Sequence, residues 1–507
     1  FSVNGNGVVT GNGSSLTAIG NLENNLTNLG TLGAGQDGQA LTWDNATSRF
    51  IMASAGGLTG LISVVRDSDS GEPTFFSDLQ TALETCKATN SHNTITFYSD
   101  IVVTSTVEIN HGGAPADVGK GYDFESLTIN FNGFKLTHDQ EDDDDTFFVT
   151  YTNASPQHNQ QIRFINGYVD RLSGTGTHYG LHFNGTGYGS IVMDKMQWYC
   201  ENGGAARLLS LTTGTHQNTQ YNDFGGSVFV SGSGSSDYAL FTGSVRCSNF
   251  SVHHFGSGTA YFASNGYVNN FVCFANTGIG FRCNAIVATN FYGQSDTNYG
   301  VNIDSNSPTE RASGFVGVSN SGIGVRAQSQ IDVLDSFYGY SESNYGGYFT
   351  GSVRASNGKC VSNTYYGGYI INSDIENISF ESLSGDYGAY IRENAILKKC
   401  NFIAREGIGA TIQGFGNDPA LANNSKFKHC DFESKYDDAS GHAVEFNLVG
   451  GSVYLMNCTF DVENASANCL YSGSAQTIRM VNSSYGPEAT TTVNANVTVT
   501  GSGNYQV

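Results

Sequence analysis

The most regular feature of the chain is a short motif in which a turn residue and a glycine precede alternating apolar and polar positions. Its clearest copies are NYGVNI (298–303), NYGGYF (344–349), YYGGYI (365–370) and DYGAYI (386–391). Looser copies are TGIGFR (277–282), SGIGVR (321–326) and EGIGAT (406–411). Alternation is typical of a half-buried β-strand, in which every second side chain faces the core. The motif therefore predicts a turn followed by a strand, repeated along the chain.

The motifs recur at a nearly constant interval. If the glycine, or the turn residue in its place, is taken as an anchor, successive anchors stand 19 to 24 residues apart. The anchors are Asp237, Gly258, Gly278, Gly300, Gly322, Gly346, Gly367, Gly388 and Gly407. A second, mostly aromatic column follows them by 13 to 15 residues and contains Phe250, Phe271, Phe291, Phe315, Phe337, Val361, Phe380 and Phe402. Two columns that stay in phase over so many repeats are typical of a solenoid.

We therefore predict an all-β fold, a right-handed parallel β-helix with one coil per repeat. Equivalent residues of neighbouring coils then stack about 4.8 Å apart. Positions one and three after the anchor face inward, for example Val301 and Ile303. Each glycine is expected to form a corner at which the backbone adopts a positive φ angle. A β-sandwich with coincidental spacing is the alternative interpretation.

The pattern changes at both ends, which divides the chain into four segments. Residues 1–57 are expected to form an N-terminal stem or connector, 58–110 a helix-capped start of the β-helix, 111–480 the β-helix, and 481–507 a small C-terminal β region. Within the stem, the leucines of LENNLTNLGTL (22–32) predict a weak seam between chains, and LTWDNATSRF (41–50) predicts a compact β-like piece.

The segment FFSDLQTALETCK (75–87) predicts a short capping helix. Ser77 and Gln80 have the spacing of a capping box. The apolar residues on one face are Leu79, Ala82, Leu83 and Cys86. TITFYSDIVVTSTVEI (94–109) predicts a pair of strands after the helix. A helix at this place covers the core and the strand edges that the first coil would otherwise expose.

Composition narrows the function classes. Lys and Arg total 23 against 45 acidic residues, and this net charge of -22 argues against a nucleic-acid partner. Without an 18-residue apolar run we expect no membrane insertion. No signal peptide is visible, and because the chain opens at Phe1 without a Met we expect an upstream part to have been removed. No CxxC pair and no Cys/His cluster with zinc spacing occurs. We therefore expect no metal and no cofactor, and we expect the ten cysteines to be small buried apolar residues.

The opening TFFSDLQTALETC, with NTITFYSDIVVTSTVEI after it, resembles the start of pectate-lyase-like β-helix proteins, and of bacteriophage tailspikes in particular. LTWDNATSRF is similar to a connector in phage tail-fibre stems. The resemblance is one of pattern and covers roughly residues 40–480. It implies a homotrimer, joined to a virion tail or baseplate through a part N-terminal to this chain. It also implies extracellular binding, and often cleavage, of a bacterial surface polysaccharide.

Outward positions of the coils form the candidate binding surface. The residues two positions after the anchor include three tyrosines on successive coils, Tyr348, Tyr369 and Tyr390. A flat aromatic ladder is a platform on which sugars pack, whereas the alternative is a ring stack that stiffens the sheet or is buried between subunits. An insertion at 199–224 carries Glu201 beside Trp198, and both are added to the substrate-binding candidates.

A charged ladder is expected four residues after the anchors. It reads Arg282, Asp304, Arg326, Thr350, Ile371 and Arg392. Its arginine–aspartate–arginine part is either an ion ladder or the charged end of a carbohydrate groove. Because Lys and Arg are scarce overall, composition leans against a polyanionic substrate.

Candidate catalytic carboxylates are Asp296, Asp304 and Glu342. Asp296 and Glu342 both lie four residues before an anchor and two coils apart. Retaining glycosidases place two carboxyl groups about 5–5.5 Å apart and inverting ones about 6.5–9.5 Å apart, which corresponds to neighbouring or next-nearest coils. The expected function is that of a tailspike that recognises a polysaccharide and, as an endoglycosidase, depolymerises it. A non-catalytic host-adhesion fibre and a secreted bacterial polysaccharide-degrading enzyme are the alternatives.

Overall fold

The computed structural model describes most of the β-helix and short parts of the N-terminal segment. The described residues are 2–3, 9–10, 39–44, 49–54, 62–67, 71–86, 91–111, 124–139, 145–151, 160–171, 179–185, 189–200, 209–213, 223–230, 238–305, 311–329, 333–413, 424–448, 452–486 and 491–506. The predicted leucine seam at 22–32 lies outside them. The predicted β-like piece at 41–50 is an antiparallel pair of β3 (Gln39–Asp44) and β4 (Arg49–Ser54). Two short strands, β1 (Ser2–Val3) and β2 (Val9–Thr10), also pair antiparallel.

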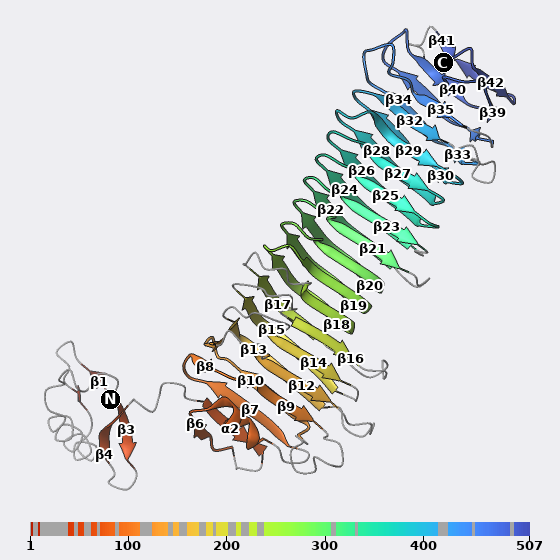
Figure 1. Cartoon of the computed structure of the whole chain (residues 1–507). Helices are drawn as coiled ribbons and strands as arrows, with labels where there is room; N and C mark the ends of the chain where they lie inside the picture. Colours follow the sequence, from red (N-terminus) through yellow and green to blue (C-terminus); the bar gives the residue numbers. More distant parts are fainter. Residues whose placement is uncertain are drawn as a thin grey trace.

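The predicted parallel β-helix is confirmed. Its strands form a continuous rod from the strands within residues 62–111 at one end to those within residues 476–506 at the other (Figure 1). A central coil shows the plan. β22 (Arg311–Ser319) bends at Gly314 and so contributes to two sheets, and after a short turn β23 (Val325–Ser329) contributes to a third. We name these three parallel sheets B, C and A in the order in which each coil visits them.

Sheet A begins at β9 and pairs in register to the last coil. Its strands are β9 (Val107–His111), β12 (Phe147–Tyr151), β14 (Leu181–Gly185), β16 (Leu209–Thr213), the first parts of β18 (Tyr238–His254), β19 (Thr259–Ala275) and β20 (Phe281–Ser295), β21 (Val301–Ser305), β23, β25 (Gly347–Thr350), β27 (Gly368–Ile371), β29 (Tyr387–Arg392), β32 (Ile408–Gln413), β35 (Val444–Asn447), β38 (Asn468–Tyr471) and β41 (Thr491–Val493).

Sheets B and C share several long strands that bend between them. Sheet B contains the whole of β7 (His92–Phe97), β10 (Ser126–Asn130), β30 (Ile396–Lys398), β33 (Lys426–Lys428), β36 (Tyr454–Met456), β39 (Gln476–Val481) and β42 (Val497–Thr500). It also contains the first part, or for β18–β20 the middle part, of the long strands β13 (Gln160–Arg171), β15 (Gly189–Cys200), β17 (Asp223–Val230), β18–β20, β22, β24 (Val333–Ser341), β26 (Arg354–Ser362) and β28 (Asp374–Ser382). Sheet C contains β8 (Ile101–Val103), β11 (Lys135–His138), the second parts of those long strands, β31 (Asn401–Ala404), β34 (Asp431–Ser434), β37 (Thr459–Val462), β40 (Ser484–Tyr485) and β43 (Tyr505–Gln506).

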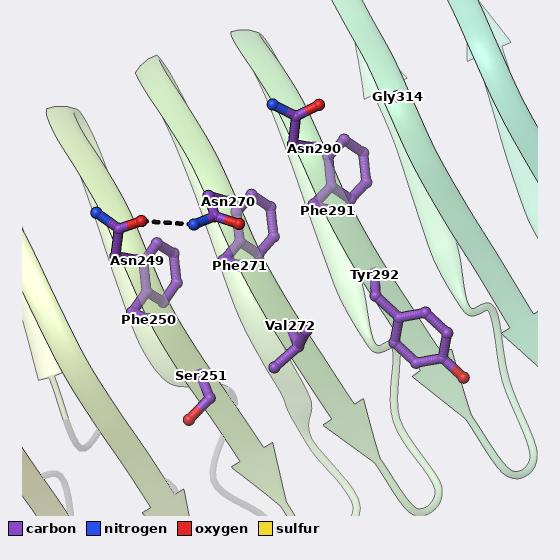
Figure 2. Close-up of a pocket in the computed structure, with 10 residues that line it drawn as sticks. All are labelled: Asn249, Phe250, Ser251, Asn270, Phe271, Val272, Asn290, Phe291, Tyr292 and Gly314. Atoms are coloured by element: carbon purple, nitrogen blue, oxygen red, sulfur yellow. Dashed lines mark hydrogen bonds between the residues drawn. The ribbon is translucent and has the colours of Figure 1, made fainter.

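The corner between sheets B and C is formed by one residue with positive φ on almost every coil. Its described members are Asn132, Asn166, Lys195, Asn249, Asn270, Asn290, Gly314, Ser336, Asn357, Asn377, Lys399, His429, Asn457, Asn482 and Gly503. Asparagine dominates because its short polar side chain tolerates this backbone conformation better than most residues do. The amides also bond along the stack, as Asn270 Nδ2 donates to Asn249 Oδ1 at 2.5 Å (Figure 2).

The repeated glycines have a different role from the predicted one. Register places Gly280, Gly300, Gly324, Gly346, Gly367, Gly388 and Gly409 in one column, so Gly278, Gly322 and Gly407 are two residues out of phase. None of the seven has a positive φ. A Cβ at Gly300 would instead lie 2.4 Å from the backbone nitrogen and oxygen of Val318. Glycine is needed here because backbone packs against backbone.

The predicted aromatic column is two inward stacks, and Val361 belongs to neither of them because it is in register with Tyr340 and Glu381. Phe250, Phe271, Phe291, Phe315 and Phe337 stack on successive coils with centroids 4.7–5.4 Å apart. A second stack, displaced by two residues, contains Phe380, Phe402, Phe432 and Phe460. All these rings are buried, together with all ten cysteines, none of which forms a disulfide. The prediction that the cysteines are buried apolar residues is confirmed.

The capping helix is confirmed with a correction at its start. α2 spans Leu79–Glu84, and Asp78 rather than Ser77 caps it, because Asp78 Oδ1 accepts the backbone N–H of Thr81 at 2.6 Å. Its apolar face is buried as predicted. Gln80 does not close a capping box, and it bonds both backbone groups of Glu108 in β9. β5 (Ile62–Arg66) pairs antiparallel with β6 (Thr74–Phe76) and with β7 beside the helix.

Two further differences concern the ends of the solenoid. The segment 94–109 contains three strands or their parts, β7, β8 and β9, in place of the predicted pair. After residue 480, β41–β43 continue the parallel pairing of β38–β40. These strands therefore form a further coil, and the strand topology does not change at residue 480. The division of the chain at that residue remains a prediction.

Candidate functional site

The tyrosine ladder predicted from sequence lies on the outer face of sheet A. Tyr348, Tyr369 and Tyr390 are paired in register on β25, β27 and β29. The first two rings lie 4.9 Å apart and 4° from parallel, and the next two 5.3 Å apart and 7° from parallel. Rings this close and this parallel cover one another's faces. Within the ladder the ring faces are therefore covered, which is the ring stack given above as the alternative to a flat platform, and the assignment of the three tyrosines to substrate binding stays a prediction.

A second row of tyrosines widens this ladder. Tyr345 and Tyr366 come from the turns that precede β25 and β27, and Tyr387 is the first residue of β29. Tyr365 stacks on Tyr366 at 3.9 Å. Tyr345 lies 5.2 Å from the ring of Tyr369, and Tyr366 lies 5.6 Å from that of Tyr390. We call these seven residues, Tyr345, Tyr348, Tyr365, Tyr366, Tyr369, Tyr387 and Tyr390, the tyrosine surface.

Four phenols of the tyrosine surface, those of Tyr345, Tyr366, Tyr369 and Tyr387, have a raised pKa and stay neutral at physiological pH. Burial, followed by the proximity of Tyr365, raises the pKa of Tyr345, and burial raises the pKa of Tyr366. Burial likewise raises the pKa of Tyr369, although the nearby Arg392 opposes the shift. A phenol that stays protonated can donate one hydrogen bond and accept others, as a sugar hydroxyl can.

Arginines lie at both ends of the ladder, in a register that differs from the predicted one. Arg326 is the residue in register with Tyr348, one coil before it, and Arg282 is in register with Asn302 rather than with Asp304. The predicted arginine–aspartate–arginine column is therefore wrong, because its anchors were out of phase. Arg282 still forms a diagonal ion pair with Asp304, at 3.7 Å.

Aromatic rings hold all three guanidinium groups, and Arg282 lies over the ring of Phe262 with Cζ 5.2 Å from the centroid. Arg326 lies over the ring of Tyr299, with Cζ 4.6 Å from the centroid. Arg392 lies over the ring of Tyr390 at 5.0 Å, and its Nη2 donates to the hydroxyl of Tyr390 at 2.9 Å and to Oε1 of Gln413 at 3.3 Å. Cation–π stacking therefore fixes the guanidinium of Arg326, whereas that of Arg392 is also fixed by the hydrogen bonds of its Nε and Nη2 to Tyr390 and Gln413.

A half-buried carboxyl group lies beyond the ladder on the same column. Register runs from Tyr390 to Thr411 and then to Glu445, and Thr411 Oγ1 donates to Glu445 Oε2 at 3.3 Å. Burial raises the pKa of Glu445, and burial and the charge of Glu445 raise the pKa of Tyr387. Sequence reasoning missed Glu445 because an insertion at 414–424 interrupts the repeat before it. A carboxyl group with a raised pKa is the property that a general acid requires.

Two of the predicted catalytic residues lie in one column, and the third does not. Asp296 and Glu342 occupy equivalent turns after β20 and β24, with Asn320 between them donating to Asp296 Oδ1 at 2.8 Å. Tyr340 and Asn363 donate to Glu342, and these bonds lower its pKa. Asp304 lies in β21 of sheet A with Arg282. A lowered pKa does not suit Glu342 to the role of general acid, and the assignment of the three residues stays a prediction.

The two candidates near residue 200 differ in outcome. Trp198 is 0% exposed and packs edge-on against Phe147 and Phe164 in the core, so its assignment to substrate binding is wrong. Its position follows from the alternation of β15, in which Met196, Trp198 and Cys200 all face inward. Glu201 lies outside the described residues.

A shallow groove of about 540 Å3 lies at the corner between sheets B and C, on β18, β19, β20 and β22 (Figure 2). Its lining residues are Asn249, Phe250, Ser251, Asn270, Phe271, Val272, Asn290, Phe291, Tyr292 and Gly314. None of them is charged, and none is a predicted site residue. Within the described part of the chain, no three His, Cys, Asp or Glu side chains gather as metal ligands would, and no helix reaches the length and apolarity that crossing a membrane requires.

Comparison with known proteins gives structural neighbours alone. No protein-family model matches the chain, and no curated protein matches its sequence. Two solved structures are similar, both mutants of the tailspike protein of Escherichia coli bacteriophage HK620, one of them in complex with a hexasaccharide. Both share 12% sequence identity with this chain, cover 94% of it and are covered over 86% of their own length, with TM-scores of 0.23 and 0.22.

Proposed function

We propose that this protein is a phage tailspike or receptor-binding tail fibre that recognises a bacterial surface polysaccharide through the tyrosine surface. The observation that carries the proposal is the ladder of Tyr348, Tyr369 and Tyr390, whose rings repeat at 4.9 and 5.3 Å. A polysaccharide is itself a regular array of hydroxyl groups. A regular row of phenol hydroxyls along a rigid rod can bond such an array at several points at once.

The setting of the ladder supports the same proposal. The three rings are half-buried, so packing fixes their rotamers before a ligand arrives. Sheet A is part of one continuous hydrogen-bonded solenoid, which keeps the spacing of the hydroxyls constant. Following the resemblance in sequence, we place the protein on the extracellular virion tail as a homotrimer. Binding of a phage to its host is the role that this arrangement serves.

The experiment uses surface-polysaccharide extracts from candidate host bacteria, with equilibrium binding measured for the whole chain. The test variant is Tyr369→Phe, which keeps the ring stack and removes one hydroxyl, and the matched control is Tyr338→Phe on sheet C. We expect a bound extract to lose affinity with Tyr369→Phe and to keep it with Tyr338→Phe. Equal binding by both variants and the unaltered protein would contradict the assignment of this surface.

Glycoside hydrolysis is a second candidate function, favoured by one observation. Glu445 has a raised pKa and lies two coils from Tyr390 on the column that contains the ladder. It is the described carboxyl group on this face that best suits a general acid. Release of discrete oligosaccharides from a bound extract, read by mass spectrometry, would establish a depolymerase. Binding without release would establish an adhesion fibre. A secreted bacterial enzyme is the remaining alternative, for which we expect a monomer rather than a trimer.

A further inference from the structure

Charge is distributed unevenly around the rod, and sheet A differs from the protein as a whole. The chain has a net charge of -22. From β20 to β32, one outward column of sheet A contains the tyrosine ladder and the next outward column contains Arg392. The described residues of these two columns include three arginines, Arg282, Arg326 and Arg392, and one acidic residue, Asp304. Asp304 pairs with Arg282. Positive charge therefore exceeds negative charge on this strip of an acidic protein.

Arg326 and Arg392 bracket the ladder. Arg326 is one coil before Tyr348, and Arg392 is on the coil of Tyr390. Three coil steps separate β23 from β29, which is about 14 Å along the rod. No carboxylate of the described residues forms an ion pair with Arg326, whose guanidinium is held by the ring of Tyr299. The arginine is thus fixed in place by an interaction that leaves its charge uncompensated by a neighbouring acid.

We propose that the polysaccharide recognised by the tyrosine surface is acidic, and that Arg326 and Arg392 bind carboxylates of sugar units at the two ends of the ladder. The inference rests on the proposed function and names its substrate class. A planar guanidinium matches a carboxylate with two parallel hydrogen bonds, and such charge-assisted bonds are about twice as strong as neutral ones. Phenol hydroxyls between the arginines donate to the same chain of oxygen acceptors.

An acidic ligand is the opposite of what the composition of the whole chain indicates. Scarcity of Lys and Arg over the whole chain leans against a polyanionic ligand, but a bound polymer contacts one face. Folding brings residues 282, 326 and 392 onto that face although they are separated by 44 and 66 positions in the chain. The surrounding negative surface then disfavours binding of an acidic polymer elsewhere, which aids specificity.

The experiment divides a surface-polysaccharide extract of candidate hosts by anion exchange into a neutral and an acidic fraction. Carboxyl groups are reduced to alcohols in half of the acidic fraction, a treatment that leaves phosphates unchanged. Binding of each fraction is measured for the unaltered chain, Arg326→Gln and Arg392→Gln. Arg479→Gln is the matched control, because Arg479 lies over the ring of Tyr454 at 5.5 Å on sheet B.

We expect the acidic fraction to bind and its carboxyl-reduced form to bind weakly. Each of the two sheet A variants should lower affinity for the acidic fraction about tenfold or more, while Arg479→Gln does not. Binding of the neutral fraction alone would overturn the inference and leave the proposed function intact. Full binding of the carboxyl-reduced polymer would overturn carboxylate recognition in favour of another anion such as phosphate. If the unaltered chain binds no fraction, and the tyrosine variants therefore change nothing, the proposed function itself is contradicted.

Discussion

The rings of Tyr369 and Tyr390 lie 5.3 Å apart and 7° from parallel, although 21 positions separate the two residues in the chain. One coil of the solenoid accounts for both numbers, because each residue stacks on its equivalent in the next coil. Replacing Tyr369 with alanine removes its ring contacts with Tyr345, Tyr348 and Tyr390 and one hydroxyl. We expect polysaccharide binding to be lost and stability to fall by about 1.5–4.5 kcal/mol, since each aromatic pair contributes about 0.5–1.5 kcal/mol. Denaturant unfolding measures the second effect, and unchanged stability would show that the stack contributes little.

Glycine at position 300 is expected to be required by backbone packing. In Gly300→Ala the new Cβ would lie 2.4 Å from the backbone of Val318, so coils must move apart. We expect destabilisation of about 2 kcal/mol or more. Gly473→Ala is the control, because a Cβ there meets no atom within 4 Å, and we expect a change within about 0.5 kcal/mol. Similar unfolding midpoints for the two variants would contradict the packing explanation.

The positive-φ corner predicts a difference between two substitutions at one position. Asn357 has φ 53°, and its Nδ2 donates to Asp335 Oδ1 at 2.7 Å. Asn357→Gly and Asn357→Ala both remove this bond, but alanine alone is strained by the backbone conformation. We therefore expect Asn357→Ala to be less stable than Asn357→Gly by about 1–2 kcal/mol. Thermal unfolding of the two variants checks this, and equal stability would show that the corner relaxes.

The free energy of unfolding is expected to fall in mild acid because His442 is buried in its neutral form. Its ring stacks on Tyr471 at 4.1 Å, and its Nδ1 accepts the backbone N–H of Asn468 at 3.2 Å. Burial lowers its pKa from 6.5 to about 4. Between these two pH values the unfolded chain binds a proton that the folded chain does not, so unfolding is favoured as pH falls. We expect a loss on the order of 1–3 kcal/mol over this window, absent in His442→Gln. The same pH dependence in both proteins would assign it to other groups.

If the protein depolymerises its ligand, Glu445 is expected to carry the acid step. Glu445→Gln should lower the rate of oligosaccharide release by about 10²–10⁴-fold. A general acid acts in its protonated form, so release by the unaltered protein should decline as pH rises through the raised pKa of Glu445. The control is Glu433→Gln, whose carboxylate pairs with Lys435 at 3.2 Å on sheet C. Undiminished release by Glu445→Gln would return attention to Asp296 and Glu342.

The architecture was predictable from sequence because every coil meets the same environment and therefore repeats the same alternation. Phase was harder to predict. In TGIGFR and SGIGVR two glycines stand two positions apart, and a strand pattern of period two looks the same after a two-residue shift. The register shows that the second glycine of each pair, Gly280 or Gly324, belongs to the column.

The same ambiguity limited the prediction of the site. The tyrosine ladder was found because one residue type recurs on three coils whose glycines were correctly aligned. Arg282 and Arg326 were assigned to the wrong column because their anchors were not. Trp198 was chosen for its place beside an insertion, whereas the alternation of its own strand puts it in the core. The corner between sheets B and C escaped notice because asparagine, glycine, serine, lysine and histidine all occupy it.

The central claim is that the tyrosine surface binds a bacterial surface polysaccharide, and a binding titration with the extract of a proven host tests it most directly. The unaltered chain is compared with the double variant Tyr348→Phe/Tyr369→Phe, which removes two hydroxyls and keeps the ring stack. Saturable binding that the double variant weakens by about tenfold or more is the result we predict. Saturable binding that the double variant retains in full would contradict the claim and place the receptor site elsewhere on the rod.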